Sequence, residues 1–98
     1  MWTQVACDAL RSGHVLELRY DGYSRSVEVH AVGFTKEDNP VMRVRQVSGG
    51  SVSNEPVGWK LLRLDEATEA VVTHQKSLAP RAGYKPGDPV MHQMTCQL

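Results

Sequence analysis

The sequence predicts a mainly β domain over residues 1–98, built as a small five-stranded barrel with one N-terminal α-helix. Apolar and polar residues alternate in several short segments, which is typical of strands with one buried face, and tight polar turns separate these segments. Helical spacing of apolar residues is confined to the start of the chain. A closed or half-closed barrel is expected because closure removes the exposed edges that such a short sheet would otherwise carry.

Composition limits the classes of function. The chain has 98 residues, of which 41% are hydrophobic, so a modest core can form without a metal or a disulfide. Lys and Arg together number 11, as do Asp and Glu, and the formal net charge is zero. Nucleic-acid binding through a global positive field is therefore disfavoured, and such a function would need a local basic patch.

The cysteines and the N-terminal residues bear on the compartment. Cys7 and Cys96 lie near opposite ends of the chain. A terminal disulfide is one alternative, but we expect two free thiols in a reducing compartment. The first residues show no basic start followed by an apolar run, and no segment approaches the roughly 18 apolar residues of a membrane span. We therefore expect a cytoplasmic protein with no signal peptide and no membrane partner.

The first element is expected to be a helix over about residues 2–12. Thr3 is a candidate cap for its start, and Ser12 and Gly13 are typical of its end. Apolar residues recur at helical spacing, which places them on one face. They are Trp2, Val5, Ala6, Ala9 and Leu10. Because one short helix is not stable alone, this face should pack on the sheet.

Strands are expected to follow over about residues 14–20, 25–34, 41–47, 59–64 and 70–74. Asp21-Gly22 is a strong hairpin signal between the first two strands. Residues 48–58 form a polar loop rich in Gly, Ser and Asn, a kind of loop that often carries function. Residues 76–98 are rich in Pro and Gly and are expected to form an irregular tail, in which residues 90–96 could add an edge strand.

Several segments of the chain match the pattern of a known family. Three of them are A-L-R-S-G, L-E-L-R-Y-D-G and R-S-V-E-V-H-A-V-G, and three more are R-V-R-Q-V-S-G-G-S, G-W-K-L-L-R-L-D-E and P-R-A-G-Y-K-P-G-D. The first three resemble the start of WYL domains, and the other three resemble the short stand-alone members of that family. The likeness covers roughly residues 5–90. Val41-Met42-Arg43 stand where the name-giving Trp-Tyr-Leu would fall.

This resemblance implies a Sm-like, or Src-homology-3-like, barrel of the kind found mostly in bacterial regulators. It further implies a regulatory module that senses a ligand or binds nucleic acid or a nucleotide. The helix-turn-helix that precedes the domain in many transcription factors is missing, so a detached sensor or partner module is expected.

Strand alternation predicts a candidate binding face. If the turn after residue 34 sets the register, Glu28 lies opposite Arg45, and His30 lies opposite Arg43 on the same outward face. Glu28 and Arg45 would then form an exposed ion pair of small energy. The side chains expected to converge are His30, Arg43, Trp59 and Arg63, with Lys60 and Gln46 at the barrel mouth and Arg25 as a further candidate at the hairpin exit.

A planar aromatic ring beside guanidinium groups suits a phosphate-bearing ligand or a stacked base. Two like charges on neighbouring strands would also cost stability unless an anion or a carboxylate lies between them. The expected partners are therefore a nucleotide, an oligonucleotide or another anionic ligand. Two alternatives remain open: a solvated strand face whose long side chains cover a tryptophan, or a surface that meets a protein partner or a second copy of the chain.

No catalytic motif is present in the sequence. The 4 histidines have no short ligand spacing, so no metal site is expected. Ser, His and Asp occur in no recognisable nucleophile motif. The run Gly49-Gly50-Ser51 lacks the Lys-Ser/Thr ending and the following helix of a phosphate-binding loop. We therefore expect no enzyme activity and no cofactor.

Overall fold

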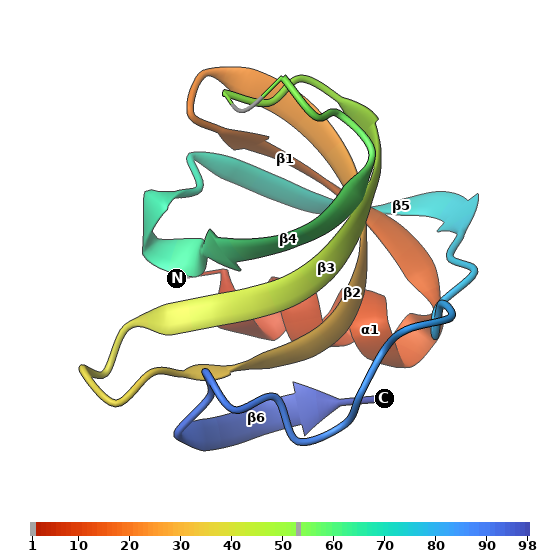
Figure 1. Cartoon of the computed structure of the whole chain (residues 1–98). Helices are drawn as coiled ribbons and strands as arrows, with labels where there is room; N and C mark the ends of the chain where they lie inside the picture. The colour runs from red at the N-terminus through yellow and green to blue at the C-terminus, as the bar shows by residue number, and fades with distance from the viewer. Residues whose placement is uncertain (1, 53) are drawn as a thin grey trace.

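The computed structural model describes residues 2–52 and 54–98, and within these ranges the chain is mainly β, as predicted (Figure 1). The elements in chain order are α1 (Thr3–Ser12), β1 (His14–Tyr20), β2 (Tyr23–Phe34), β3 (Pro40–Gly49), β4 (Gly58–Arg63), the short 3-10 helix η1 (Leu64–Glu66), β5 (Glu69–Lys76) and β6 (Gln93–Gln97). The predicted β1 bounds are confirmed, and β2 to β5 differ from the predicted bounds by one or two residues at their ends.

Helix α1 ends at Gly13 as predicted, but its start differs. Thr3 lies inside the first turn, Trp2 occupies the capping position, and no side chain caps the helix. The Trp2 indole Nε1 donates a hydrogen bond of 2.8 Å to Ala67 O, so the side chain of Trp2 ties the start of α1 to the segment before β5. Among the described residues, no helix has the length and apolar character needed to cross a bilayer.

The sheet is antiparallel in the order β4-β3-β2-β1-β5, and β6 pairs with β2. Asp21 and Gly22 form the β1–β2 turn with φ of 52° and 78°. Both angles are positive, as the tightest hairpin turns require, which confirms the hairpin predicted from Asp21-Gly22. Strand β2 is long enough to be shared on one edge: β1 pairs with its first half, and β6 pairs with Ala31 to Phe34.

The closed form of the predicted five-stranded barrel is wrong, because the sheet formed by the described residues is open and has six strands. Within the described residues, β4 pairs only with β3, and β5 pairs only with β1. Core side chains lie where β4 and β5 would have to join. The Arg63 N–H donates to the Tyr20 hydroxyl over 3.2 Å, and the Ala67 carbonyl accepts from Trp2. Since these backbone groups already have partners, the closing strand pair is not needed to satisfy them.

The core lies between α1 and the sheet. Helix α1 packs against β1, β2, β5 and β6 and contributes Ala6, Ala9 and Leu10 to the main apolar cluster. Leu62 and Leu64 at the end of β4 and the start of η1 are both buried. The helix therefore covers the apolar face of the sheet, as its spacing predicted.

The C-terminal part of the chain returns across β2. Residues 77–92, called the tail segment below, connect β5 to β6 and form neither helix nor strand. The edge strand anticipated over residues 90–96 is present as β6 (Gln93–Gln97), three residues further along at its start. Figure 1 shows the tail segment and β6 in blue, beside β2 and near the C-terminus.

The prediction of two free thiols is wrong, because Cys7 of α1 and Cys96 of β6 form a disulfide. Both cysteines are buried, and their Cα atoms lie 6.1 Å apart. Sequence separation hid this contact: β6 reaches the helix only because it pairs with β2 beside α1. The disulfide therefore fastens the end of the chain to its beginning.

Candidate functional site

The β2–β3 register is interrupted at His30. Glu28 lies opposite Arg45, as predicted, but the register shifts between Val29 and Ala31, and Arg43 lies opposite Ala31. The predicted pairing of His30 with Arg43 is therefore wrong by one residue. Such a bulge leaves one residue of the longer strand without a partner and bends that strand. His30 is the extra residue, and its side chain points into a buried cluster.

Glu28 was expected to be exposed and paired with Arg45, and this is wrong. Its side chain is 2% exposed and accepts from Arg81 through both oxygens, at 2.7 and 3.2 Å, and from Leu78 N–H at 2.7 Å. The tail segment covers this face of β2, which strand alternation cannot reveal. Burial alone would raise the pKa of Glu28, but the hydrogen bonds from Arg81 and Leu78 outweigh it, and the pKa lies below its ordinary value.

His30 lies at the centre of this cluster and is fully buried. Its Nδ1 donates to Glu28 O over 2.9 Å, since a carbonyl can only accept, and its Nε2 accepts from Arg81 N–H over 3.0 Å. Because the acceptor role leaves no proton on Nε2, the ring is neutral. Burial, in agreement, holds the pKa of His30 below its ordinary value. His30 is therefore a positioning group and not a free ligand-binding side chain.

Two aromatic rings pack on His30. The Trp59 ring centroid lies 4.7 Å from that of His30 in an edge-on arrangement, and the Tyr84 centroid lies 5.1 Å away. Both rings also line a pocket of about 260 Å³, which we call the tail pocket. Its lining comes from Arg43 of β3, Trp59 of β4, and residues 83–85 and 88–90 of the tail segment. Trp59 and Arg43 therefore line one pocket, and His30 lies against the Trp59 and Tyr84 rings.

The Arg43 charge is neutralised inside this pocket. Its Nε and Nη2 donate to the two oxygens of Asp88, at 2.7 and 3.4 Å, and Asp88 is buried. These hydrogen bonds hold the pKa of Asp88 below its ordinary value. The carboxylate that the sequence argument required beside Arg43 is therefore supplied by the chain itself. Burial, with a smaller contribution from Asp88, raises the pKa of Tyr84.

Arg63 does not join the pocket. It lies opposite Val41 at the end of β4 and pairs with Asp65 at 2.6 Å and Glu66 at 3.8 Å. These partners follow it directly in η1. The predicted row of His30, Arg43 and Arg63 is therefore wrong, because each side chain is held by a different set of neighbours.

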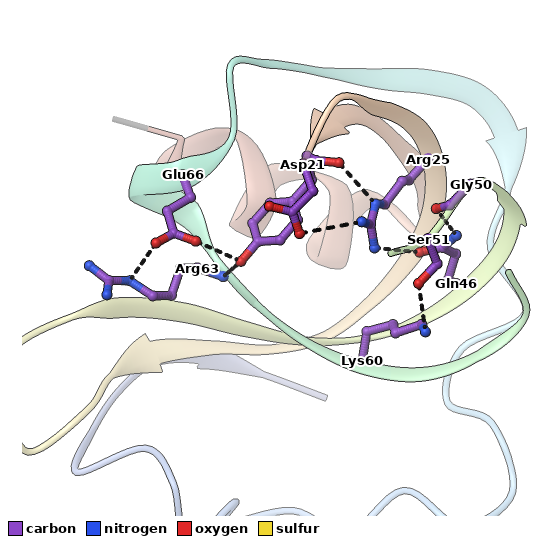
Figure 2. Close-up of polar contacts among 9 residues, drawn as sticks. Asp21, Arg25, Gln46, Gly50, Ser51, Lys60, Arg63 and Glu66 are labelled. Carbon is purple, nitrogen blue, oxygen red and sulfur yellow. Dashed lines mark hydrogen bonds and ion pairs between the residues drawn. The ribbon is translucent and has the colours of Figure 1, made fainter. Parts of the chain in front are cut away.

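The other predicted site residues, Arg25, Gln46 and Lys60, lie outside the tail pocket in the contacts that Figure 2 shows. Tyr20 connects these contacts to Arg63 and Glu66. Arg25 is buried, donates to Tyr20 O and to Gln46 Oε1, and lies 3.7 Å from the carboxylate of Asp21. Its guanidinium also stacks over the rings of Tyr20 and Tyr23. Arg25 therefore holds the β1–β2 turn in place.

Gln46 and Lys60 anchor the described part of the loop predicted over residues 48–58, in which Ser53 lies outside the described residues. Gln46 Nε2 donates to Gly50 O at 3.0 Å, and Lys60 Nζ lies 3.2 Å from Ser51 Oγ (Figure 2). A Cβ on Gly50 would lie 2.1 Å from a Tyr23 ring atom. Gly49 and Gly50 are thus explained by close packing against the β1–β2 hairpin.

Four side chains of the candidate site were missed by strand reasoning: Arg81, Tyr84, Lys85 and Asp88. All belong to the tail segment, whose Pro and Gly content predicted irregular structure but no location. The P-R-A-G-Y run is one of the better-matched segments of the family likeness, and a hydrophobic plug over a barrel end is the interpretation of Tyr84 that the sequence favours. Nothing in local spacing connects it to β2, although Arg81 and Glu28 are 53 residues apart and in contact.

Comparisons with protein-family models, with curated proteins and with solved structures found no match to this chain. Over residues 2–52 and 54–98, no group of three or more His, Cys, Asp or Glu side chains could hold a metal ion. The geometry of the tail pocket is therefore the main basis for a functional proposal.

Proposed function

We propose that this chain is a non-catalytic ligand-binding module and that the tail pocket is its site. One observation carries the proposal: Trp59 and Tyr84, from distant parts of the sequence, line one pocket and rest on the same buried histidine. Apolar pockets with a few placed polar groups are typical of small-ligand sites. Because His30 uses both ring nitrogens within the protein, it holds the two rings in place without competing for ligand.

The regulatory, ligand-sensing role implied by the WYL resemblance is kept as part of this proposal. The strand order and the 3-10 turn between β4 and β5 support a relationship to Sm-like barrels in which the last strand pair has opened. In a sensor, ligand binding has to change the structure of a segment that a partner domain or chain can contact. The tail segment is suited to this role, because it lines the pocket and is held to the sheet by a few side-chain contacts.

The arginine partners favour a small ligand over an oligonucleotide. Arg43 is paired with Asp88, and Arg63 is paired with Asp65. Binding of a polyanion depends on several unpaired cations along one surface. Pairing within the chain removes much of this attraction, so the nucleic-acid alternative has less physical support than the small-ligand one.

The compartment needs a different proposal from the cytoplasm. The expectation of a cytoplasmic protein rested on free thiols and on an N-terminus without a signal-peptide pattern, and the Cys7–Cys96 disulfide removes the first of these supports. Disulfides persist mainly in oxidising compartments, so we infer that this chain works in one. Mass spectrometry of protein isolated with its thiols trapped by alkylation tests the inference: two alkylated cysteines would contradict it.

The proposed site can be tested through the two indole N–H signals in a nitrogen-15 NMR spectrum. Trp59 lines the tail pocket, whereas Trp2 donates to Ala67 O and lines a separate cavity of about 220 Å³ beside β1 and β5, so its signal reports binding outside the tail pocket. We expect small aromatic fragments to shift the Trp59 signal and leave the Trp2 signal in place. Loss of the signal in Trp59→Phe assigns it. If no fragment moves Trp59 selectively, the alternative of a protein-interaction or self-association module takes the place of this proposal.

A further inference from the structure

Two side chains that line the tail pocket, Trp59 and Lys85, have hydrogen-bond donors that no acceptor of the described residues occupies. Both oxygens of Asp88 accept from Arg43, and Oδ1 also accepts from Val90 N–H at 3.0 Å. The Tyr84 hydroxyl donates to Leu98 O. Within the part of the chain that the structure describes, the Trp59 indole N–H and the Lys85 ammonium have no hydrogen-bond partner.

The indole N–H is accessible because of the residue beside it. A Cβ on Gly83 would lie 3.7 Å from Trp59 Nε1, and no other heavy atom lies within 4 Å of that position. Because Gly83 has no side chain, this residue itself leaves the nitrogen edge of the indole uncovered. An acceptor group in the pocket can therefore reach this donor.

The charges of the lining favour a single negative charge on the ligand. Arg43 and Asp88 neutralise each other, and Lys85 is exposed and adds one unpaired positive charge. A carboxylate at this place would accept charge-assisted hydrogen bonds, which are stronger than neutral ones. A doubly charged phosphate would exceed the charge that the lining offers.

The pocket is also small. Its volume of about 260 Å³ lies below the roughly 300–1,000 Å³ typical of drug-sized ligand sites. One ring or two fused rings fit this space with a short acidic arm, whereas a nucleotide has a ribose and a phosphate in addition to its base.

We propose that the ligand is a small aromatic monocarboxylate, with its ring against Trp59 and Tyr84 and its carboxylate accepting from Lys85 Nζ and Trp59 Nε1. This assignment rests on the proposed function of the tail pocket. It adds the chemical class of the ligand, which is inferred from the two free donors, the net charge of the lining and the volume of the pocket.

Three probes test the assignment on the full, disulfide-linked chain: indole-3-acetate, its neutral analogue indole-3-acetamide, and adenosine monophosphate. We expect the acetate to shift the Trp59 indole signal and to bind about tenfold more tightly than the acetamide, as one charge-assisted hydrogen bond implies. Lys85→Gln should reduce acetate binding to the level of the acetamide. The matched control Lys76→Gln, which removes the same charge from β5, should leave binding unchanged.

The failures of the two proposals can be told apart. Equal binding of acetate and acetamide, or unchanged acetate binding by Lys85→Gln, would overturn the monocarboxylate assignment while the pocket keeps its function. Tighter binding of adenosine monophosphate would overturn it in favour of a nucleotide. If none of the three probes shifts the Trp59 signal, the monocarboxylate assignment fails together with the proposed site.

Discussion

At the scale of a single residue, the protonation of His30 affects the free energy of unfolding. In the folded chain its ring is neutral and its pKa is lowered by burial, whereas in the unfolded chain it titrates at the ordinary value of 6.5. As the pH falls below that value, the unfolded state takes up a proton first. The free energy of unfolding therefore decreases toward acid pH. The stability of the folded chain is unaffected by His30 protonation only above pH 6.5, where the ring is neutral in both states.

The prediction at this scale is a histidine-dependent loss of stability between pH 7.5 and 5.5. In His30→Gln, the slope of unfolding free energy against pH should be smaller by at most about 1.4 kcal/mol per pH unit. Urea unfolding at several pH values measures it, and the exposed His74→Gln serves as the control. An unchanged slope in His30→Gln would show that this ring is not the group that titrates. NMR titration of His30 in the wild-type chain checks the lowered pKa directly.

At the scale of elements, the tail segment depends on a few side-chain anchors. It has no strand or helix of its own, and Glu28 holds it through Arg81 and the Leu78 N–H. Asp88 holds its second half through Arg43. A buried carboxylate with three hydrogen bonds is costly to disturb, because the groups left behind lose their partners. Glu28 is therefore the main side-chain anchor of the first half of the tail segment.

Glu28→Gln should loosen the tail segment. The change keeps the side-chain volume and an acceptor for Leu78 but removes the charge that Arg81 recognises. We expect faster hydrogen exchange at the Leu78 and Arg81 amides and a decrease of about 1–3 kcal/mol in the free energy of unfolding. Glu37→Gln, in the exposed β2–β3 turn, is the matched control. Exchange rates equal to those of the control would mean that other contacts hold the segment.

At the scale of the whole molecule, the disulfide joins the first helix to the last strand over a separation of 89 residues. Strand β6 pairs only with β2 among the described residues, and five residues make a short ladder. The covalent link restricts the unfolded chain and keeps β6 beside α1 when its ladder opens.

Removing the disulfide should destabilise the chain by about 2–5 kcal/mol. The double variant Cys7→Ser, Cys96→Ser and the reduced wild-type chain should show similar decreases in Tm. The β6 amides should be the first to lose exchange protection. The variant itself must not respond to reductant, which controls for other effects of the reagent. A wild-type Tm that is the same with and without reductant would contradict the prediction.

The sequence alone determined the local structure, because the signals are local. Alternation located five strands, Gly13 marked the end of the helix, and Asp21-Gly22 marked a hairpin. These features depend on backbone geometry and on neighbours a few residues away. Within the candidate site, the same pattern placed Arg43 and Trp59 on adjacent strands, and both line the tail pocket.

Only the tertiary structure decided what covers each face. Alternation shows that Glu28 and His30 share a side of β2 but not that Arg81, more than 50 residues later, covers that side. The same limit applies to Cys7 and Cys96, and to the carboxylates that neutralise Arg43 and Arg63. Contacts between distant segments depend on how the whole chain packs, so no local pattern encodes them. The tail pocket is made of such contacts, because it forms only where the tail segment packs against the sheet.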